Sequence, residues 1–178
     1  DVYINHDGHL TIKLTNANNE IVVYDHFDNI ENPEKTIEKF EFADGTVMDH
    51  TELLTMLQVH GNEGNNTVKG TKYDDTMSGF AGNDKLYGYA GDDVLIGGVG
   101  NDRLEGKDGN DTYLFNLNDG KDQILDNTGT DMIKFGDGIT KDNLDVYINH
   151  DGHLTIKLTN ANNEIIVYNH FDTIESPE

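Results

Sequence analysis

Acidic side chains recur every nine residues through the middle of this chain of 178 residues. From Gly61 to Leu114 the sequence divides into six consecutive nonapeptides, and five of them carry aspartate at position 6. The position-6 residues are Asn66, Asp75, Asp84, Asp93, Asp102 and Asp111. Carboxylates repeated at a fixed spacing can together hold a hard divalent cation, because such ions prefer oxygen ligands.

Glycine and apolar residues occupy the other fixed positions of each nonapeptide. Glycine fills position 1 six times and position 4 five times, with Tyr73 as the exception. Position 8 is apolar throughout: Val68, Met77, Leu86, Leu95, Leu104 and Tyr113. This pattern predicts a glycine-rich turn followed by a three-residue strand with one inward side chain. Two nonapeptides then form one coil of ~18 residues, with strands on opposite faces and a thin apolar core between them.

Stacked coils should bring the acidic residues together. Loops on one edge come from nonapeptides 18 residues apart, and adjacent coils lie ~4.8 Å apart. Asp93 should therefore lie between Asp75 and Asp111, and Asp84 beside Asp102. Such a ladder of like charges is unfavourable unless a cation neutralises it. Calcium accepts about 6 to 8 oxygen ligands in flexible geometry, so carboxylates and turn carbonyls of two loops can enclose it, whereas magnesium should substitute poorly.

The nonapeptides resemble the G-G-x-G-x-D-x-U-x motif of the repeats-in-toxin (RTX) proteins. The clearest matches are GFAGNDKLY, GYAGDDVLI, GGVGNDRLE and GKDGNDTYL, although only Gly97-Gly98 has the double glycine. The resemblance implies a calcium-filled parallel β-roll in proteins that are exported unfolded through a type I secretion channel and fold outside. The segment DTYLFNLNDGKDQI, followed by GTDMIKFGDGIT, is similar to the segment that ends such arrays. It would place Asp122, after a two-residue slip in register, beside the loop of Asp102.

This resemblance also implies the ligands, the cofactor and the partners. The expected metal ligands are Asn66, Asp75, Phe80, Gly82, Asp84, Tyr89, Gly91, Asp93, Gly98, Gly100, Asp102, Lys107, Gly109, Asp111 and Asp122. About four to six calcium ions should bind. The expected partners are calcium, neighbouring modules of the same chain and the type I secretion machinery of the parent protein. The location should be extracellular or at the bacterial cell surface.

A second, longer repeat predicts how the chain is organised. Residues 1–34 recur at 145–178, an offset of 144, with four substitutions. The parent protein should therefore carry tandem modules of this length. We expect residues 1–60 to be the flanking cap of the preceding module, 61–114 the β-roll, and 115–178 a C-terminal capping segment that ends in a truncated copy of 1–34. The chain begins inside a strand-like run, so it looks like part of a longer protein.

The flanks should be rich in antiparallel strands. Asp7-Gly8 is a favoured two-residue hairpin turn between alternating apolar residues. Asp49, with Glu52 three residues on, resembles a capping arrangement that opens one short helix through Leu57. The predicted fold class is all-β, a parallel β-roll with antiparallel β-rich caps and one short helix.

Composition excludes several functional classes. Twelve Lys and Arg residues against 34 Asp and Glu give a net charge of −22, and Arg103 is the only arginine. Nucleic acid and anionic lipid are therefore not expected partners. Cysteine is absent, and neither Ser78 nor Ser176 lies in a G-x-S-x-G elbow. No apolar run is long enough to span a membrane. The sequence predicts a module that is not itself an enzyme.

Other interpretations of single motifs remain. His6-x-x-His9 and its copy His150-x-x-His153 could bind zinc, but two histidines fall short of a tetrahedral site, and exposed hairpin residues explain them better. Adjacent acids such as Asp74-Asp75 could be a glycosidase pair, but neighbours in one strand point apart. The glycine-rich loops could cradle phosphate or form a calcium-free solenoid, but no P-loop lysine follows, and turns alone do not require the acid at position 6.

Two other functions compete with a structural calcium module. The module could bind a glycan or host surface, which only the position-2 aromatics Phe80 and Tyr89 favour. Alternatively, it could be an auxiliary module of an enzyme elsewhere in the parent chain, as in similar modules attached to proteases, lipases or alginate epimerases.

Overall fold

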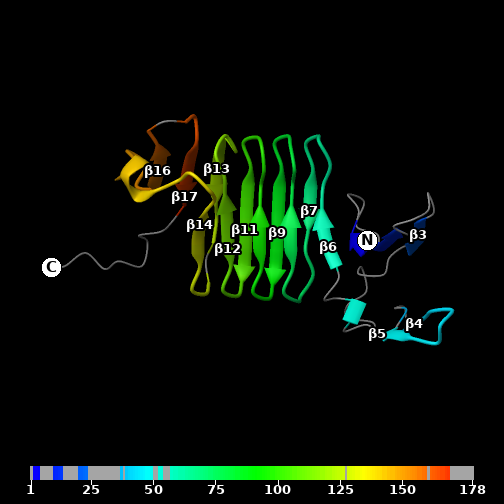
Figure 1. Cartoon of the computed structure of the whole chain (residues 1–178). Coiled ribbons are helices and arrows are strands. Elements are labelled where there is room, and N and C mark those ends of the chain that lie inside the picture. The colour runs from blue at the N-terminus through cyan, green and yellow to red at the C-terminus, as the bar shows by residue number, and fades with distance from the viewer. Residues whose placement is uncertain are drawn as a thin grey trace.

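Two parallel sheets, packed face to face, form the body of the computed structural model (Figure 1). The structure describes residues 2–4, 10–13, 20–23, 37, 39–49, 52–53, 57–126, 128–159 and 161–168. The roll strands of sheet I are β6 (Leu57–His60), β8 (Thr76–Ser78), β10 (Val94–Ile96), β12 (Thr112–Phe115) and β14 (Met132–Phe135). Those of sheet II are β7 (Thr67–Lys69), β9 (Lys85–Ala90), β11 (Arg103–Asp108) and β13 (Lys121–Ile124). The chain alternates between the sheets, as expected for a parallel β-roll.

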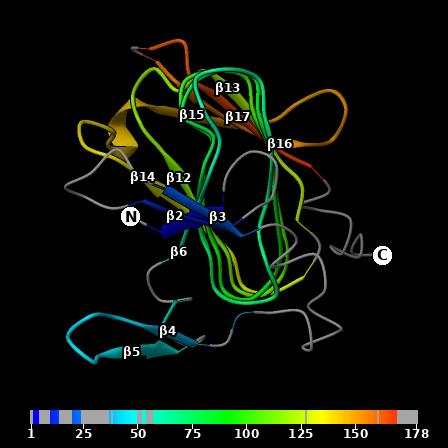
Figure 2. The ribbon, with the colours of Figure 1, turned by 90° about the vertical axis from the view of Figure 1, so that its right-hand side faces the viewer.

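The 18-residue coil predicted from the nonapeptides is confirmed by the strand register. Val94 pairs with Thr76 in sheet I, and Arg103 pairs with Lys85 in sheet II. The position-8 side chains all point into the space between the sheets, where none is more than 3% exposed. Viewed along the roll, the turns of successive coils superimpose at both edges (Figure 2). Glycine is needed where coils meet closely, since a Cβ at Gly100 would lie 1.7 Å from the Gly82 carbonyl oxygen.

The final coil is longer and closes the core. Tyr113 pairs with Ile133, and Leu104 pairs with Ile124, so the offset rises from 18 to 20 residues. Both sheets thus continue past Leu114. Phe115 and Ile124 are each 2% exposed, and Ile133 and Phe135 pack against them. These apolar residues extend the core beyond the regular nonapeptides.

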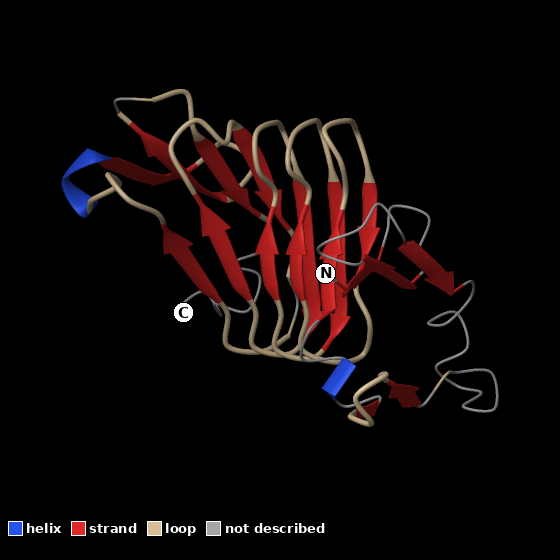
Figure 3. Cartoon of the chain, turned by 45° about the vertical axis from the view of Figure 1, so that its right-hand side comes forward, coloured by secondary structure: helices blue, strands red, loops and turns tan. Residues whose placement is uncertain are grey.

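Each end of the roll carries a three-stranded antiparallel sheet (Figures 1 and 3). The N-terminal one consists of β1 (Val2–Ile4), β2 (Leu10–Lys13) and β3 (Glu20–Val23), and β1 pairs in parallel with β6. The C-terminal one consists of β15 (Leu144–Ile148), β16 (Leu154–Leu158) and β17 (Glu164–Val167), and β17 pairs in parallel with β13. The segment expected to cap a preceding module is therefore also part of sheet I of this roll.

The connecting segments contain little helix. Strands β4 (Lys39–Glu41) and β5 (Val47–Asp49) form a separate hairpin, and Lys141–Asn143 form a 3₁₀ turn, η2. The Asp49 carboxylate accepts a hydrogen bond from the Glu52 amide at 2.9 Å, as the capping pattern predicted, and residues 52–53 are helical. The predicted helical end at Leu57 is wrong, because Leu57 opens β6 and pairs with Val2.

The Asp7-Gly8 turn lies outside the described residues, whereas its copy is described. Gly152 has a φ of 87°, the left-handed conformation that glycine adopts readily, and its amide donates to the Asn149 carbonyl at 3.0 Å. Among the described residues, no helix has the length and apolar character needed to cross a membrane.

Candidate metal centre

The position-6 residues form a ladder along each edge of the roll. On one edge, the amides of Asn66, Asp84 and Asp102 donate to Oδ1 of the position-6 acid one coil later, at 2.7, 2.8 and 2.9 Å. The third of these acceptors is Asp122, so the two-residue slip expected from the family resemblance is present. On the other edge, Asp75 donates to Asp93 and Asp93 to Asp111, both at 2.8 Å. Each acid therefore contacts the loop of the adjacent coil.

The second carboxylate oxygen of four ladder residues is buried without a hydrogen-bond partner. These oxygens are Oδ2 of Asp84, Asp93, Asp102 and Asp111, and the four residues are each 1% exposed. Burying a polar atom without a partner is costly, and burying a charged one more so. A bound cation would supply the missing partner, so the donor set fits calcium, which takes carboxylate and carbonyl oxygens.

Position-1 glycines leave open the space beside these oxygens. A Cβ at Gly79 would lie 2.3 Å from Oδ2 of Asp84, and one at Gly106 would lie 2.0 Å from Oδ2 of Asp111. Any other residue at position 1 would therefore press against the carboxylate. Glycine at position 1 thus keeps the acid within reach of its own loop.

The predicted carbonyl ligands lie in the same turns. The position-2 residues Phe80, Tyr89, Gly98 and Lys107 all have left-handed φ, at 74, 79, 94 and 81°. At position 4, Gly82, Gly91 and Gly109 have φ of 120, 112 and 142°, and Gly100 packs against Gly82. The Phe80 carbonyl accepts from the Val99 amide at 2.8 Å, and the Gly100 carbonyl accepts from Lys121 at 3.2 Å. Since a carbonyl oxygen has two lone pairs, each keeps one for a cation.

Burial raises the pKa of the ladder carboxylates. It raises the pKa of Asp93 to about 7, those of Asp102 and Asp111 to about 6, and that of Asp122 to about 8. Neighbouring acids, such as Asp75 and Asp111 beside Asp93, raise it further. Hydrogen bonds from the backbone amides act in the opposite direction. The calcium-free ladder is therefore unfavourable in its ionised form, and a cation relieves it.

In the first two loops, the position-6 side chain accepts hydrogen bonds from residues of its own loop. Oδ2 of Asp75 accepts from the Thr71 amide at 2.5 Å and the Thr71 hydroxyl at 2.9 Å. In the first loop, Oδ1 of Asn66 likewise accepts from the Asn62 amide at 2.5 Å. These two loops lack the oxygen that the next four leave unpartnered, so they offer a poorer metal site.

Position 5 forms a second ladder that the sequence analysis missed. Oδ1 of Asn83 accepts from the Asn101 amide at 2.9 Å, and Oδ1 of Asp92 accepts from Asn110 at 2.8 Å. These bonds run from each coil to the next, in the opposite sense to those of position 6. The sequence signal was present, because position 5 is Asn65, Asp74, Asn83, Asp92, Asn101 and Asn110.

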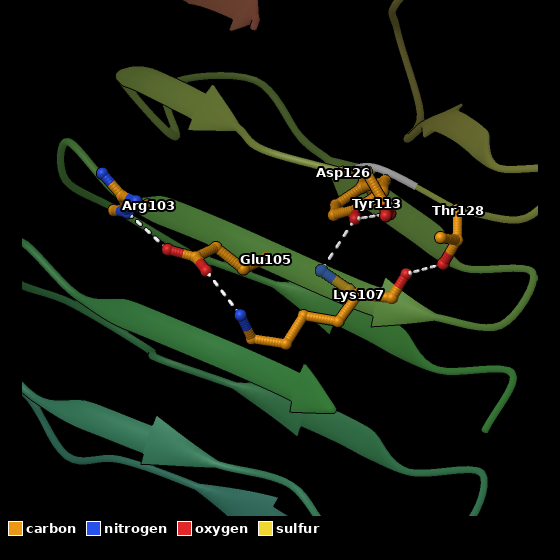
Figure 4. A network of polar contacts seen from close by, with 7 residues as sticks. Arg103, Glu105, Lys107, Tyr113, Asp126 and Thr128 are labelled. Atoms are coloured by element: carbon orange, nitrogen blue, oxygen red, sulfur yellow. Dashed lines mark hydrogen bonds and ion pairs between the residues drawn. The ribbon is translucent and has the colours of Figure 1, made fainter. Parts of the chain in front are cut away.

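The C-terminal end adds two acids that the sequence analysis also missed. Oδ1 of Asp131 accepts from the Asp111 amide at 3.0 Å, so Asp131 extends the position-6 ladder that contains Asp93 and Asp111. One potential ligand atom each from Asp111, Asp126 and Asp131 lie within 4.8 Å of one another. Tyr113 links this group to the roll, because its hydroxyl donates to Asp126 and accepts from the Gly106 amide at 2.9 Å (Figure 4).

The histidine motif does not form a comparable centre. Among the described residues, His150 is 91% exposed and lies 3.1 Å from Asp151, while the His153 ring packs on Tyr168 at 4.3 Å. His6 and His9 lie outside the described residues. Asp92 and Asp93 likewise diverge, since Asp92 is exposed and accepts from Asn110 whereas Asp93 is buried.

Comparison with known proteins decides the family. Residues 60–95 and 78–113 match the RTX calcium-binding nonapeptide repeat, and residues 9–52 match the haemolysin-type calcium binding protein related domain. Residues 60–113 are RTX calcium-binding nonapeptide repeats. This RTX module is also similar to the solution structure of the AlgE6R3 subunit of the Azotobacter vinelandii mannuronan C5-epimerase. The identity is 29% and the TM-score 0.50, over 65% of this chain and 77% of that one. No curated protein matches the chain significantly.

Proposed function

We propose that calcium outside the cell switches this RTX module from an unfolded to a folded state. The observation that carries the proposal is the set of four buried Oδ2 atoms without hydrogen-bond partners, on Asp84, Asp93, Asp102 and Asp111. The folded roll needs a cation at these atoms, and the sites do not exist in the unfolded chain. Binding energy therefore becomes folding energy.

The number of ions follows from the ladders. Three loop-to-loop contacts on each edge are recorded by hydrogen bonds from Asn66, Asp84 and Asp102 and from Asp75, Asp93 and Asp111. The first contact on each edge involves an internally closed loop. About four to six ions would then bind, the lower number if the two first contacts stay empty.

We further propose that the module is a structural, export-linked segment of a large secreted toxin, adhesin or exoenzyme and has no catalytic activity of its own. A net charge of −22 keeps a calcium-free chain extended, which suits passage through type I secretion machinery. Calcium at ~10⁻³ M outside the cell matches the weak sites of extracellular modules.

Circular dichroism of the full chain tests this proposal. At ~10⁻⁷ M free calcium the roll should be largely disordered, and at ~10⁻³ M it should show a cooperative gain of β signal. Magnesium at the same concentration is the control and should produce little folding. A fully folded roll in excess chelator would refute the calcium switch.

A second candidate, a surface for acidic polysaccharide, is favoured by the outer face of sheet II. Its strands carry half of the twelve Lys and Arg residues: Lys69, Lys85, Arg103, Lys107, Lys121 and Lys157. The Glu105 carboxylate forms ion pairs with Arg103 Nε at 2.6 Å and with Lys107 Nζ at 3.0 Å (Figure 4). Tyr87 and Tyr89 stack beside them at 6.4 Å, and Tyr89 is 41% exposed. A glycan array probed with the calcium-loaded chain, with Lys85→Ala as the matched variant, tests this candidate.

A further inference from the structure

The two end sheets have the same internal structure. Val2 pairs with Ile12 in the first and Val146 with Ile156 in the second, which are the same positions 144 residues apart. The other pair of strands shows the same agreement, since every partner in the β2–β3 register has its copy in the β16–β17 register. The sequence copies thus fold identically within the sheet.

The two copies attach to the roll by opposite edges. The N-terminal copy uses its first strand, because β1 pairs with β6, and its third strand β3 ends sheet I. The C-terminal copy uses its third strand, because β17 pairs with β13, and its first strand β15 ends sheet II. Each copy therefore leaves free the edge that the other copy uses.

Apolar side chains near each free edge are exposed, although their counterparts in the other copy are buried or paired. Ile165 on β17 is 1% exposed, whereas its counterpart Ile21 on β3 is 56% exposed. On the other free edge, Val146 and Ile148 of β15 are 56% and 58% exposed. Their counterparts, Val2 and Ile4, are the β1 residues that pair with β6. Large apolar side chains are exposed at the positions that become paired in the other copy.

The pleat of the sheet is consistent with both attachments. Ile165 and Ile156 are neighbours across β16–β17, and both are buried on the core side, at 1% and 7% exposed. The equivalent row of the N-terminal copy runs through Ile12 to Val2, which pairs with Leu57. Two residues further along β1, Ile4 pairs with Val59, a core residue that is 1% exposed. A register slip of one residue would have turned the opposite face of the sheet towards the core. The observed registers are therefore compatible with one face of the sheet packing against the cores of two rolls.

We propose that this three-stranded sheet is a junction that joins consecutive RTX rolls. Its third strand completes sheet II of the preceding roll, and its first strand begins sheet I of the following roll. The partner of β15 is thus the next module's equivalent of β6, and the partner of β3 is the preceding module's equivalent of β13. This inference rests on the proposed calcium-folded module and on the tandem arrangement that the 144-residue repeat predicts. It makes neighbouring modules one continuous sheet instead of beads on a flexible linker.

The junction would place the outer face of sheet II of one roll next to the outer face of sheet I of the following roll. Sheet II, with its lysines, arginine and tyrosines, becomes continuous with sheet I of the next roll. The exposed strand positions of sheet I in this chain include Thr76 and Met132. The roll strands of sheet I, β6, β8, β10, β12 and β14, carry one charged residue, Lys134. Basic and nearly uncharged faces should follow one another from module to module.

The test extends the full chain by one period, with residues 35–178 repeated after Glu178. Because the chain has no cysteine, engineered pairs report contacts directly. With calcium, Tyr147→Cys and a cysteine in the appended copy of Gln58 should form a disulfide. A second pair, Gln123→Cys and Ile166→Cys, should form one in the same molecule. In the chain of 178 residues, Tyr147→Cys with Gln58→Cys is the control and should form no disulfide within one molecule.

A charge at the free edge gives an independent readout. Ile148→Lys should leave the calcium midpoint of the 178-residue chain unchanged, because Ile148 is 58% exposed there. In the extended chain the same change should raise the midpoint of the second roll severalfold. Ile21→Lys is the matched control and should be neutral in both chains.

Two results would overturn the junction. One is an extended chain in which both rolls fold with calcium, the Tyr147 pair stays reduced and Ile148→Lys has no effect. The other is an extended chain that fails to fold with calcium while the 178-residue chain folds, since one sheet would then not serve two rolls. Absence of calcium-induced folding in both chains would instead contradict the calcium function.

Discussion

Replacing single ladder acids by asparagine separates a metal ligand from a ladder hydrogen bond. In Asp93→Asn, the amide oxygen can still accept from the Asp75 amide, which lies 2.8 Å from Oδ1. The second oxygen, which is buried without a partner, becomes an NH₂ group that cannot bind a cation. In Asp75→Asn, the second oxygen already has Thr71 as its partner. Asn66 shows that an asparagine side chain can take the same internal bond.

The expected difference follows from the partner that calcium supplies. A buried polar atom without a partner costs about 1–3 kcal/mol, and a charged one more. Calcium removes this cost at Asp93 but has little to remove at Asp75. At about 1.4 kcal/mol per factor of ten, the calcium midpoint of Asp93→Asn should lie about 5- to 100-fold above that of Asp75→Asn.

Calcium titrations of both variants, followed by circular dichroism, measure this difference. Each substitution removes one negative charge, so the pair is matched for net charge. Equal midpoints would refute the assignment of the unpartnered oxygens as metal ligands and the sharing of ions between loops 18 residues apart.

Three further predictions concern pH, coil packing and the last site. Burial raises the pKa of Asp93 to about 7 and that of Asp122 to about 8, above ~3.9 in the unfolded chain. The calcium-free chain should therefore become more folded as the pH falls from 8 towards 5 and less folded as the pH rises through 6 to 8, whereas the calcium midpoint rises at low pH. Circular dichroism in chelator at several pH values checks the sign, and a β signal that does not rise at low pH would contradict it. Gly100→Ala should prevent calcium-induced folding, because its Cβ would lie 1.7 Å from the Gly82 carbonyl oxygen. Gly64→Ala, whose Cβ would have its nearest contact at 3.3 Å, should affect calcium-induced folding only mildly. Similar circular dichroism of the two variants in calcium would be inconsistent with the coil spacing. Asp126→Asn should lower the calcium stoichiometry by one ion in calorimetry while the roll still folds, and an unchanged stoichiometry would remove Asp126 from the site.

The local features of the roll were predictable because every nonapeptide has the same residue types at the same structural positions. Glycine at position 1, aspartate at position 6 and an apolar residue at position 8 specify the turn, the ladder and the core in every coil. The same regularity fixed the 18-residue offset that brings Asp93 beside Asp75. The family resemblance supplied the slip to Asp122, which periodicity alone would have placed two residues earlier.

The missed features depend on pairing between segments distant in sequence. Position 5 was overlooked because asparagine and aspartate are common in turns, and only the stacked coils show that they accept amides from the next loop. Asp126 and Asp131 follow the end of the regular period, so their place in the ladder depends on the 20-residue last coil. Leu57 reads as the end of a helix in isolation, but pairing with Val2 makes it a strand. The attachment of one sheet by two edges likewise cannot be read from one copy.

A crystal structure of the calcium-loaded chain, with anomalous scattering to locate the ions, tests the central claim most directly. Ions should lie ~2.3–2.6 Å from Oδ2 of Asp84, Asp93, Asp102 and Asp111, with turn carbonyls completing the ligands. Calcium bound only elsewhere, with these four oxygens still without a metal, would contradict the account.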